Sequence, residues 1–359
     1  MIDQKIKVLV VDDSNVARML LVHLLESDPR IGVIGSVKDG QAAVDFVQKS
    51  KPDVVLMDIY MPVLDGFEAT RRIMETQPVP IIICTATTNP KEVATTFRLM
   101  EAGAVACVEK PVAREHADFE ELVANLLQTV KLMSEVKVVR RWPKSREASL
   151  PAPRPDEQKY VSGEIQLVGI GASTGGPPAL QTILASLPKD FSVPLLIVQH
   201  IAHGFLPGLV EWLNQTTGWQ VHIGSHGICP LPGHAYLAPD DFQMGVTSTG
   251  RILLTRENPE NGLRPAVSYL FRSLSEVCGP NAVGVLLTGM GKDGAVELKL
   301  MKDRGASTIA QDRETSVVHG MPGEAIELGG TMYVLPADKI ADVLITLVNR
   351  RHLAGGIES

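Results

Sequence analysis

Cysteine, aromatic residues and positive charge are all scarce in this chain of 359 residues. Its four cysteines are widely scattered and form no Cys-x-x-Cys pair, so a zinc site or a disulfide framework is not expected. Aromatic residues make up 4 % of the sequence, which argues against a platform for base stacking. Lys and Arg total 34 against 41 Asp and Glu, a net charge of −7. General nucleic-acid binding needs a basic surface, and we therefore expect no nucleic-acid partner.

Long hydrophobic runs are also missing. The longest, such as 81–84 and 194–198, have the length of a strand, far below the roughly 20 residues of a membrane-spanning helix. The N-terminal apolar run 8–11 ends at once in Asp12 and Asp13, unlike a signal peptide. We therefore predict a reduced, cytoplasmic protein that is not embedded in a membrane.

Short β-branched runs alternate with segments of helical period from residue 6 to about 133. Strands are expected over 6–11, 31–37, 53–57, 80–84 and 105–108. Helices are expected over 14–27, 40–49, 65–76, 90–101 and 112–133. Strands that are apolar on both faces indicate a parallel sheet covered by helices on both sides. The sequence thus predicts a doubly wound (βα)5 domain over 1–133, with its site at the carboxyl edge of the sheet.

A basic, proline-rich stretch over 134–162 separates this domain from the rest of the chain. It has no periodicity and is typical of a semi-extended linker. Basic runs can bind nucleic acid or a membrane, but a solvated hinge or a docking surface for an acidic partner is the favoured interpretation.

A second alternation, over 163–359, predicts a larger α/β domain with three layers, α/β/α, around another doubly wound parallel sheet. Strands are expected over 165–170, 194–199, 282–288, 307–310 and 332–335. Helices are expected over 176–187, 205–215, 265–277, 294–304, 322–328 and 337–350. The segment 235–254 differs, because short apolar runs flank a Ser-Thr-Gly turn, and it predicts an antiparallel hairpin at one edge.

Acidic residues follow two strands of the first domain: Asp12 and Asp13 follow the first, and Asp58 follows the third. Three neighbouring carboxylates repel one another unless a cation lies between them, and oxygen ligands of this kind suit Mg²⁺. Thr85 and Lys110 end the fourth and fifth strands, which predicts a site for a phosphoryl group. Asp58 would be the nucleophile, and Lys110 and Mg²⁺ would take up charge. Taken singly, each residue could instead be a solubilising loop residue.

Residues 6–130 resemble the receiver domain of two-component response regulators. The matching motifs are VLVVDDS (8–14), MDIYMPVLDG (57–66), Thr85-Ala86 and Glu109-Lys110-Pro111. The resemblance implies that Asp58 is the phosphoacceptor. It also implies that Asp13, Asp58 and the backbone carbonyl of Tyr60 bind Mg²⁺, with help from Asp12.

By the same resemblance, Thr85 and Lys110 report phosphorylation to the rest of the domain. Cys107 is a departure, because receivers usually carry an aromatic residue of the switch at this position.

The second domain opens with a serine motif. Its first strand enters Gly171-Ala172-Ser173-Thr174-Gly175, which fits G-x-S-x-G, the sharp strand-to-helix turn that exposes a nucleophilic serine. The start of the following helix would offer free N–H groups to an oxyanion. A dinucleotide site is the alternative, but Thr174 occupies the third glycine position of that fingerprint. The next strand moreover ends in Gln199-His200 rather than in an acidic residue.

His200 and Asp293 complete a candidate triad. His200 ends the strand expected beside the serine strand, where it could act as general base. His203 forms an H-x-x-H pair with it, but no third ligand follows at a metal-binding spacing. Asp293 lies in a second glycine-rich turn, 289–294, where it could orient the imidazole, cap a helix, or do both.

Residues 163–348 resemble the catalytic domain of the CheB family of chemotaxis protein-glutamate methylesterases. The matches are GIGASTGGP (169–177), Gln199-His200, LPGHAYLAP (231–239), NAVGVLLTGMGKDGA (281–295) and HGMPGEA (319–325). The resemblance implies that Ser173 is the nucleophile, His200 the base and Asp293 the orienting acid. It places Thr174 and the backbone of Met290 at the oxyanion.

The family resemblance implies a phosphorylation-activated esterase that acts on glutamate methyl esters of chemoreceptors, with a slower glutaminase activity and no cofactor in the esterase. It implies a CheA-type histidine kinase as phosphodonor. A non-catalytic response regulator that docks on receptors or kinase is the alternative; a DNA-binding regulator would need a helix-turn-helix, which we do not find. Departures expected at the rim of the site are Ala202, His203, Gln243 and Ser268.

Overall fold

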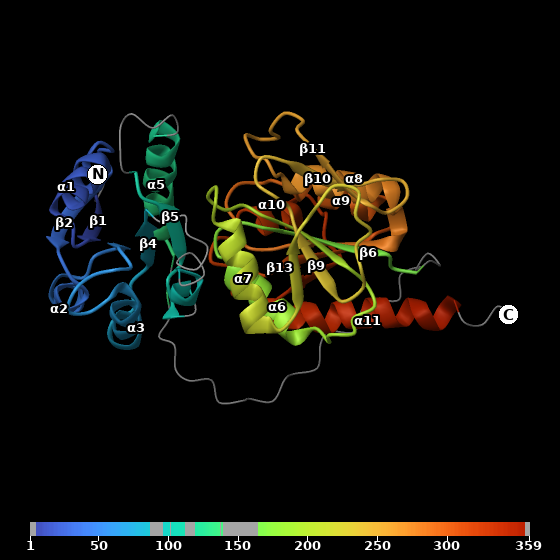
Figure 1. The fold of residues 1–359 in the computed structure, drawn as a ribbon, viewed down its shortest axis with the longest axis horizontal. Coiled ribbons are helices and arrows are strands. Elements are labelled where there is room, and N and C mark those ends of the chain that lie inside the picture. The colour runs from blue at the N-terminus through green and yellow to red at the C-terminus, as the bar shows by residue number, and fades with distance from the viewer. Residues whose placement is uncertain are drawn as a thin grey trace. The chain divides into compact units, whose positions relative to one another are not determined.

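The structure is a computed structural model, and it describes residues 5–86, 96–100, 102–111, 119–136, 138 and 164–355. The chain divides into two compact units, Met1–Ala148 and Ser149–Ser359, which are described separately (Figure 1). Parts of the helices expected over 90–101 and 112–133, and most of the linker expected over 134–162, lie outside the described residues. No helix in the described part of the chain is long and apolar enough to span a membrane.

The first unit is built on a five-stranded parallel sheet in the order β2-β1-β3-β4-β5. The strands are β1 (Ile6–Val11), β2 (Ile31–Val37), β3 (Val54–Met57), β4 (Ile81–Thr85) and β5 (Ala106–Glu109). The helices are α1 (Asn15–Glu26), α2 (Gly40–Ser50), α3 (Gly66–Thr76) and α5 (Phe119–Met133), and residues 96–100 are also helical. The order reverses between β1 and β3, which is where open α/β sheets form their sites.

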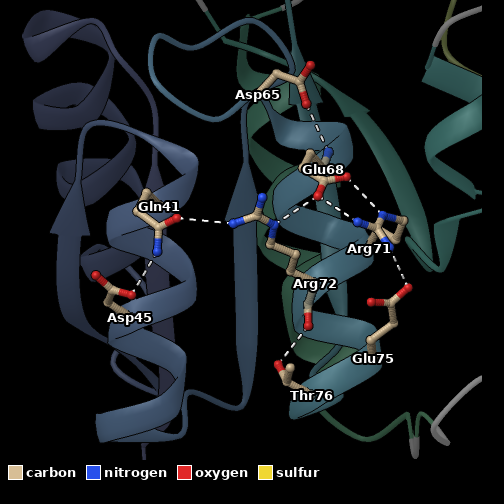
Figure 2. Close-up of polar contacts among 8 residues, drawn as sticks. All are labelled: Gln41, Asp45, Asp65, Glu68, Arg71, Arg72, Glu75 and Thr76. Carbon is tan, nitrogen blue, oxygen red and sulfur yellow. Dashed lines mark hydrogen bonds and ion pairs between the residues drawn. The ribbon is translucent and has the colours of Figure 1, made fainter.

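Charged and polar side chains of helix α3 contact one another and helix α2 (Figure 2). Asp65 caps it by accepting the N–H of Glu68 at 2.8 Å. The Glu68 carboxylate accepts from Arg71 and Arg72, and these contacts lower its pKa to about 2. Arg72 also reaches Gln41 on α2 at 3.3 Å. The side chains of α3 therefore tie it to α2 and fix the start of the helix after the loop that carries Asp58.

The second unit is built on a seven-stranded parallel sheet in the order β14-β13-β12-β6-β7-β9-β8. Its strands are β6 (Leu167–Ala172), β7 (Leu195–Gln199), β8 (Gln220–Ile223), β9 (His234–Leu237), β12 (Ala282–Leu286), β13 (Ser307–Gln311) and β14 (Tyr333–Leu335). Its helices are α6 (Gly176–Ser186), α7 (Leu206–Thr217), α8 (Val267–Val277), α9 (Ala295–Asp303), α10 (Met321–Glu327) and α11 (Ala337–Gly355). A separate antiparallel pair consists of β10 (Gln243–Val246) and β11 (Ile252–Thr255).

The expected antiparallel hairpin is confirmed where β10 and β11 pair across the Ser-Thr-Gly turn, as a separate two-stranded sheet. The expectation that residues 235–238 belong to it was wrong, because β9 lies inside the parallel sheet between β7 and β8. Ala235, Tyr236 and Leu237 are all buried, so both faces of this strand are covered, as an interior strand requires. The edge strand β8 was not predicted, because its four residues follow α7 closely and only Val221 is buried.

Helix α8 packs one apolar side into the core of this unit. Leu270, Phe271 and Leu274 are fully buried at helical spacing and join the core with residues of β6, β7, β12 and α9. The first turn of α8 lies against the carboxyl edge of the sheet, since Val267 contacts Gly171 at the end of β6. This helix consequently supports the region where the serine motif begins.

Candidate functional site

The three carboxylates predicted in the first unit come together. Asp12 and Asp13 follow β1, Asp58 follows β3, and one oxygen of each lies within 4.8 Å of the other two. Asp12 is buried, Asp58 is half-buried and Asp13 is exposed. Oxygen ligands with one open side fit Mg²⁺, which keeps several of its waters. We name these three residues the acidic cluster.

Lys110, which follows β5, lies between two carboxylates of the acidic cluster. Its Nζ atom is 2.7 Å from Asp12 Oδ2 and 2.8 Å from Asp58 Oδ2. Burial raises the pKa of Asp58, and Lys110 opposes that rise without cancelling it. Burial alone would lower the pKa of Lys110, but its two carboxylate partners outweigh burial and raise it. The ammonium group therefore stays charged beside the candidate phosphoacceptor.

The first unit also contains three other residues singled out in the receiver sequence: Thr85, Tyr60 and Cys107. Thr85 is buried at the end of β4, and its carbonyl accepts the N–H of Lys110 at 2.8 Å. Tyr60 lies in the loop after β3, with an exposed side chain. Cys107 pairs with Ile83 across β5 and β4, and burial raises the pKa of its thiol.

The serine motif forms a sharp turn between β6 and α6. The Ser173 N–H donates to the carbonyl of Thr288 at 3.0 Å, and its own carbonyl accepts from Gly176 at 2.8 Å. Gly175 has a φ of 78°, in the left-handed region, and a side chain there would meet Val317. This geometry places Ser173 at the tip of the turn, directly before the N-terminus of a helix.

His200 follows the neighbouring strand β7 and is joined to the serine turn through the backbone. Its N–H donates to the carbonyl of Ala172 at 2.9 Å. The buried side chain of Gln199 donates at 2.8 Å to the carbonyls of both Ser173 and His200. Gln199 thus holds the two turns together, a role that the sequence did not predict. A polar residue at the end of an apolar strand is the signal that could have indicated it.

Asp293 is 3 % exposed and accepts hydrogen bonds from two elements. His200 Nε2 lies 3.0 Å from Asp293 Oδ2, and the N–H groups of Val267 and Ser268 donate to the carboxylate at 2.6 and 3.2 Å. Burial would raise the pKa of Asp293, but these partners outweigh burial and lower it. The helix that follows Asp293, α9, has no side-chain cap. The carboxylate lies instead at the start of α8.

The Ser173 hydroxyl and the His200 ring are not joined by a hydrogen bond in the described part of the chain. Because Nε2 is engaged with Asp293, Nδ1 is the ring nitrogen left for the serine. The backbone N–H groups of Thr174 and Met290 make no hydrogen bond among the described residues. Gly289, next to Met290, packs so closely on Ser173 that a side chain there would overlap it. Two free donors therefore lie beside the serine.

The departures expected at the rim separate into two groups. Ala202 and His203 lie in the loop after β7, and the His203 side chain is 75 % exposed, 3.5 Å from Asp241. Gln243 and Ser268 are 0 and 3 % exposed, so their placement at the rim was wrong. Both side chains are buried, and their oxygen atoms accept hydrogen bonds from backbone N–H groups, Gln243 from Ala266 and Ser268 from Gly294. Among the described residues, the acidic cluster is the group that gathers three candidate metal ligands.

Comparisons with known proteins divide the chain in the same way. A family model of the CheB methylesterase matches residues 168–344, and a model of the response regulator receiver domain matches residues 8–123. A protein-glutamate methylesterase/protein-glutamine glutaminase of Nitrosospira multiformis is 53 % identical over 96 % of this chain and 98 % of its own length. One from Methanospirillum hungatei is 45 % identical over 97 and 100 %.

A solved structure is also similar. The CheB methylesterase catalytic domain of Thermotoga maritima has 41 % sequence identity and a TM-score of 0.50, and it covers 52 % of this chain and 100 % of that domain.

Proposed function

This chain belongs to the CheB methylesterase family and carries a response regulator receiver domain, and from that premise we propose that it removes methyl groups from glutamate side chains under the control of phosphorylation. The proposed substrate is a γ-glutamyl methyl ester on the cytoplasmic part of a chemoreceptor. The observation that carries the proposal is the 3.0 Å hydrogen bond between His200 and Asp293, beside the sharp turn that carries Ser173. The protein would act in the cytoplasm.

The proposed reaction has two steps. Ser173 Oγ attacks the ester carbonyl, its proton passes to Nδ1 of His200, and His200 returns the proton to the departing methanol. A water molecule, deprotonated by the same nitrogen, then attacks the acyl-enzyme and releases glutamate and Ser173. Asp293 keeps the ring oriented through Nε2 and stabilises its charged form. No cofactor takes part in this chemistry.

The backbone N–H groups of Thr174 and Met290 are the proposed donors to the oxyanion. They make no other hydrogen bond in the described residues, and the positive end of α6 begins two residues beyond Thr174. Preformed donors of this kind stabilise charge that develops on the carbonyl oxygen. The relatives are named as glutaminases as well, and attack on a glutamine carboxamide differs only in releasing ammonia. That reaction should be slower, because an amide is less reactive.

We further propose that Asp58 accepts a phosphoryl group from a CheA-type histidine kinase. Mg²⁺ would be held by the acidic cluster and the Tyr60 carbonyl, and it would neutralise charge on the transferring group. Lys110 already lies 2.8 Å from Asp58 and would bind a phosphoryl oxygen. Thr85, at the end of the neighbouring strand, would respond to the same group.

Methanol release from a methylated receptor fragment tests the function. The full-length protein should release methanol, faster with a small phosphodonor, and Ser173→Ala should release almost none. If the full-length protein released methanol no faster than the receptor fragment alone, the result would instead support a non-catalytic regulator that only docks on receptors or kinase.

A further inference from the structure

Gln199 is a buried side chain that joins the turns carrying Ser173 and His200. It is the last residue of β7 and is 4 % exposed. Its amide nitrogen donates at 2.8 Å to the carbonyl of Ser173 and also at 2.8 Å to the carbonyl of His200. An amide nitrogen carries two hydrogens, so both are in use and neither is left for a substrate. Any effect of Gln199 on the reaction must therefore pass through the backbone of the two turns.

The peptide group between Ser173 and Thr174 is fixed at its carbonyl. That oxygen accepts the N–H of Gly176 at 2.8 Å in addition to the amide of Gln199. A carbonyl oxygen has two lone pairs, so both are occupied and the peptide plane cannot rotate without losing one of these bonds. In a trans peptide the N–H points away from the carbonyl of the same plane. The N–H of Thr174 is therefore directed away from Gln199.

This peptide group presents a donor next to the nucleophile. The N–H of Ser173 itself is occupied, because it donates to the carbonyl of Thr288 at 3.0 Å. The N–H of Thr174 makes no hydrogen bond among the described residues. Hydrogen bonds accepted by a carbonyl polarise its peptide group and strengthen the N–H at the other end. Gln199 thus both aims the Thr174 N–H and makes it a stronger donor.

The other end of the Gln199 amide has no partner. Its Oε1 atom is buried without a hydrogen bond in the described part of the chain, and a side chain at Gly176 would overlap it. The reverse orientation of the amide would place Oε1 against two carbonyl oxygens, so the orientation with the nitrogen toward them is favoured. A buried, unpaired acceptor destabilises a fold. A glutamine at this position is therefore explained by what its nitrogen holds.

We infer that Gln199 is a positioning residue for the oxyanion of the esterase reaction: it holds the Ser173–Thr174 peptide so that the Thr174 N–H meets the oxygen on which negative charge develops. Its second bond, to the His200 carbonyl, keeps the turn of the base in place beside the turn of the nucleophile. Gln199 does not touch the substrate and acts through Thr174. The inference deepens the proposed esterase function and rests on it.

Loss of the Gln199 amide has a consequence that differs from a general loss of structure. The Ser173 carbonyl then keeps Gly176 as its one partner, and the Thr174 N–H loses its alignment. This change slows reactions that place negative charge on an oxygen in the oxyanion site. Sulfur is a weaker acceptor than oxygen and gains less from the same donors. A probe with sulfur at this position should therefore be affected less.

The test uses two probes that differ in one atom. A fluorophosphonate ester labels Ser173 when the serine oxygen displaces its fluoride, and its P=O oxygen takes the place of the oxyanion. The analogue with P=S carries sulfur there. The ratio of the two labelling rates, oxygen over sulfur, measures the contribution of the oxyanion donors. In the full-length protein, Gln199→Met keeps the length of the side chain and removes both donors, and Gln199→Leu repeats the comparison if methionine impairs folding.

Asn214→Leu is the matched control. Asn214 lies on α7, and its amide also joins two elements: the nitrogen donates to the carbonyls of Val210 and Val221, at 2.9 and 2.8 Å. Its oxygen accepts the N–H of Val221 at 2.9 Å. The substitution therefore removes bonds of the same kind at the edge strand β8. Near-ultraviolet circular dichroism verifies that each variant is folded.

Labelling of Gln199→Met by the oxygen probe should slow about thirtyfold, and the oxygen-to-sulfur ratio should fall about tenfold. Asn214→Leu should keep the wild-type ratio. An unchanged ratio in the Gln199 variants would overturn the inference even if both probes reacted more slowly, because equal slowing is the effect of a general structural defect. An equal fall of the ratio in Asn214→Leu would overturn it as well.

Neither probe needs a receptor, so the outcomes separate this inference from the proposed function. A wild-type protein that the oxygen probe does not label at Ser173 would contradict the proposed serine chemistry itself. A labelled wild-type protein with an unchanged ratio in the Gln199 variants contradicts this inference alone. Failure of the proposed methyl ester substrate would appear in the methanol assay and leave the ratio as expected.

Discussion

His200 contacts Asp293 through Nε2, at 3.0 Å from Oδ2, so Nδ1 is the ring nitrogen left for the proposed proton transfer. The carboxylate is held in turn by backbone donors at the start of α8. A neutral ring with its proton fixed on Nε2 has its lone pair on Nδ1, the form required of a general base. The acid therefore selects the tautomer as well as the orientation of the ring.

Ser173 and His200 are expected to act as one unit. Either Ser173→Ala or His200→Ala should lower methanol release by at least about a hundredfold, and the double variant should be little worse, because losses within a triad are not additive. His203→Ala, which alters an exposed neighbour, should keep its activity. A Ser173→Ala protein with more than a tenth of the wild-type rate would contradict serine catalysis, since a tenfold loss is only about 1.4 kcal/mol of barrier.

Asp293→Asn should reduce turnover and also change the response of stability to acid. The pKa of Asp293 is lowered in the folded protein, whereas an unfolded Asp titrates near about 3.9. Its carboxylate thus adds stability that is complete above about pH 4 and is lost as the pH falls through the folded value. Urea unfolding at pH 7 should show Asp293→Asn to be the less stable protein, and the difference should shrink toward pH 3. A constant difference would show that the carboxylate is not held as an anion.

The sequence predicted the strand-end residues well, because a polar residue that directly follows a strand must lie where that strand ends, at the carboxyl edge of the parallel sheet. Asp12, Asp58, Ser173 and His200 could be assigned in this way, and the structure brings them to those edges. Ser268 could not, since its link to Asp293 spans 25 residues and uses backbone donors. No local pattern records such a contact.

Strand order was predicted less well than strand position. Periodicity identified residues 235–238 as extended, but it could not tell an edge hairpin from an interior strand. The pairing of β9 with both β7 and β8 decides that question, and it depends on which apolar faces are covered in the folded unit.

Asp58 should be the phosphoacceptor of the first unit. A small phosphodonor should label the wild-type protein in the presence of Mg²⁺ and fail to do so after chelation, because the acidic cluster needs a cation to admit another anion. Asp58→Asn should abolish the label. Asp53→Asn, at the opposite end of β3, is the matched control and should be labelled normally. Undiminished base-labile label in Asp58→Asn would exclude this assignment.

Lys110 should weaken Mg²⁺ binding before phosphorylation. Its ammonium group already contacts two carboxylates of the acidic cluster, and its positive charge repels the cation. Lys110→Met should bind Mg²⁺ about tenfold more tightly, the effect of one unit charge some 6 Å from a divalent ion in water. Lys131→Met removes the same charge beside Asp28, 3.0 Å away, and should leave the affinity unchanged. Calorimetric titration with Mg²⁺ measures both, and equal affinities would mean that Lys110 does not compete for these oxygens.

The receiver is expected to restrain the esterase until Asp58 is phosphorylated. The linker expected over 134–162 keeps the two units at roughly millimolar effective concentration, so weak docking would suffice to hinder access to Ser173. Phosphate on Asp58 would attract the side chains of Lys110 and Thr85, and this movement would alter the surface of the receiver. A tenfold rise in activity requires a change of only about 1.4 kcal/mol in that docking, and Cys107, in place of an aromatic ring, should keep the response modest.

Removal of residues 1–150 should therefore raise basal methanol release, and a phosphodonor should then have no effect. The second unit has its own buried core and matches a catalytic domain solved alone, so the truncated protein is expected to fold. Full-length Asp58→Asn is the control, and it should keep the low basal rate with or without the phosphodonor. If the truncated enzyme were no faster than the unphosphorylated full chain, the receiver would not be an inhibitor, and activation would have to come from docking on the receptor.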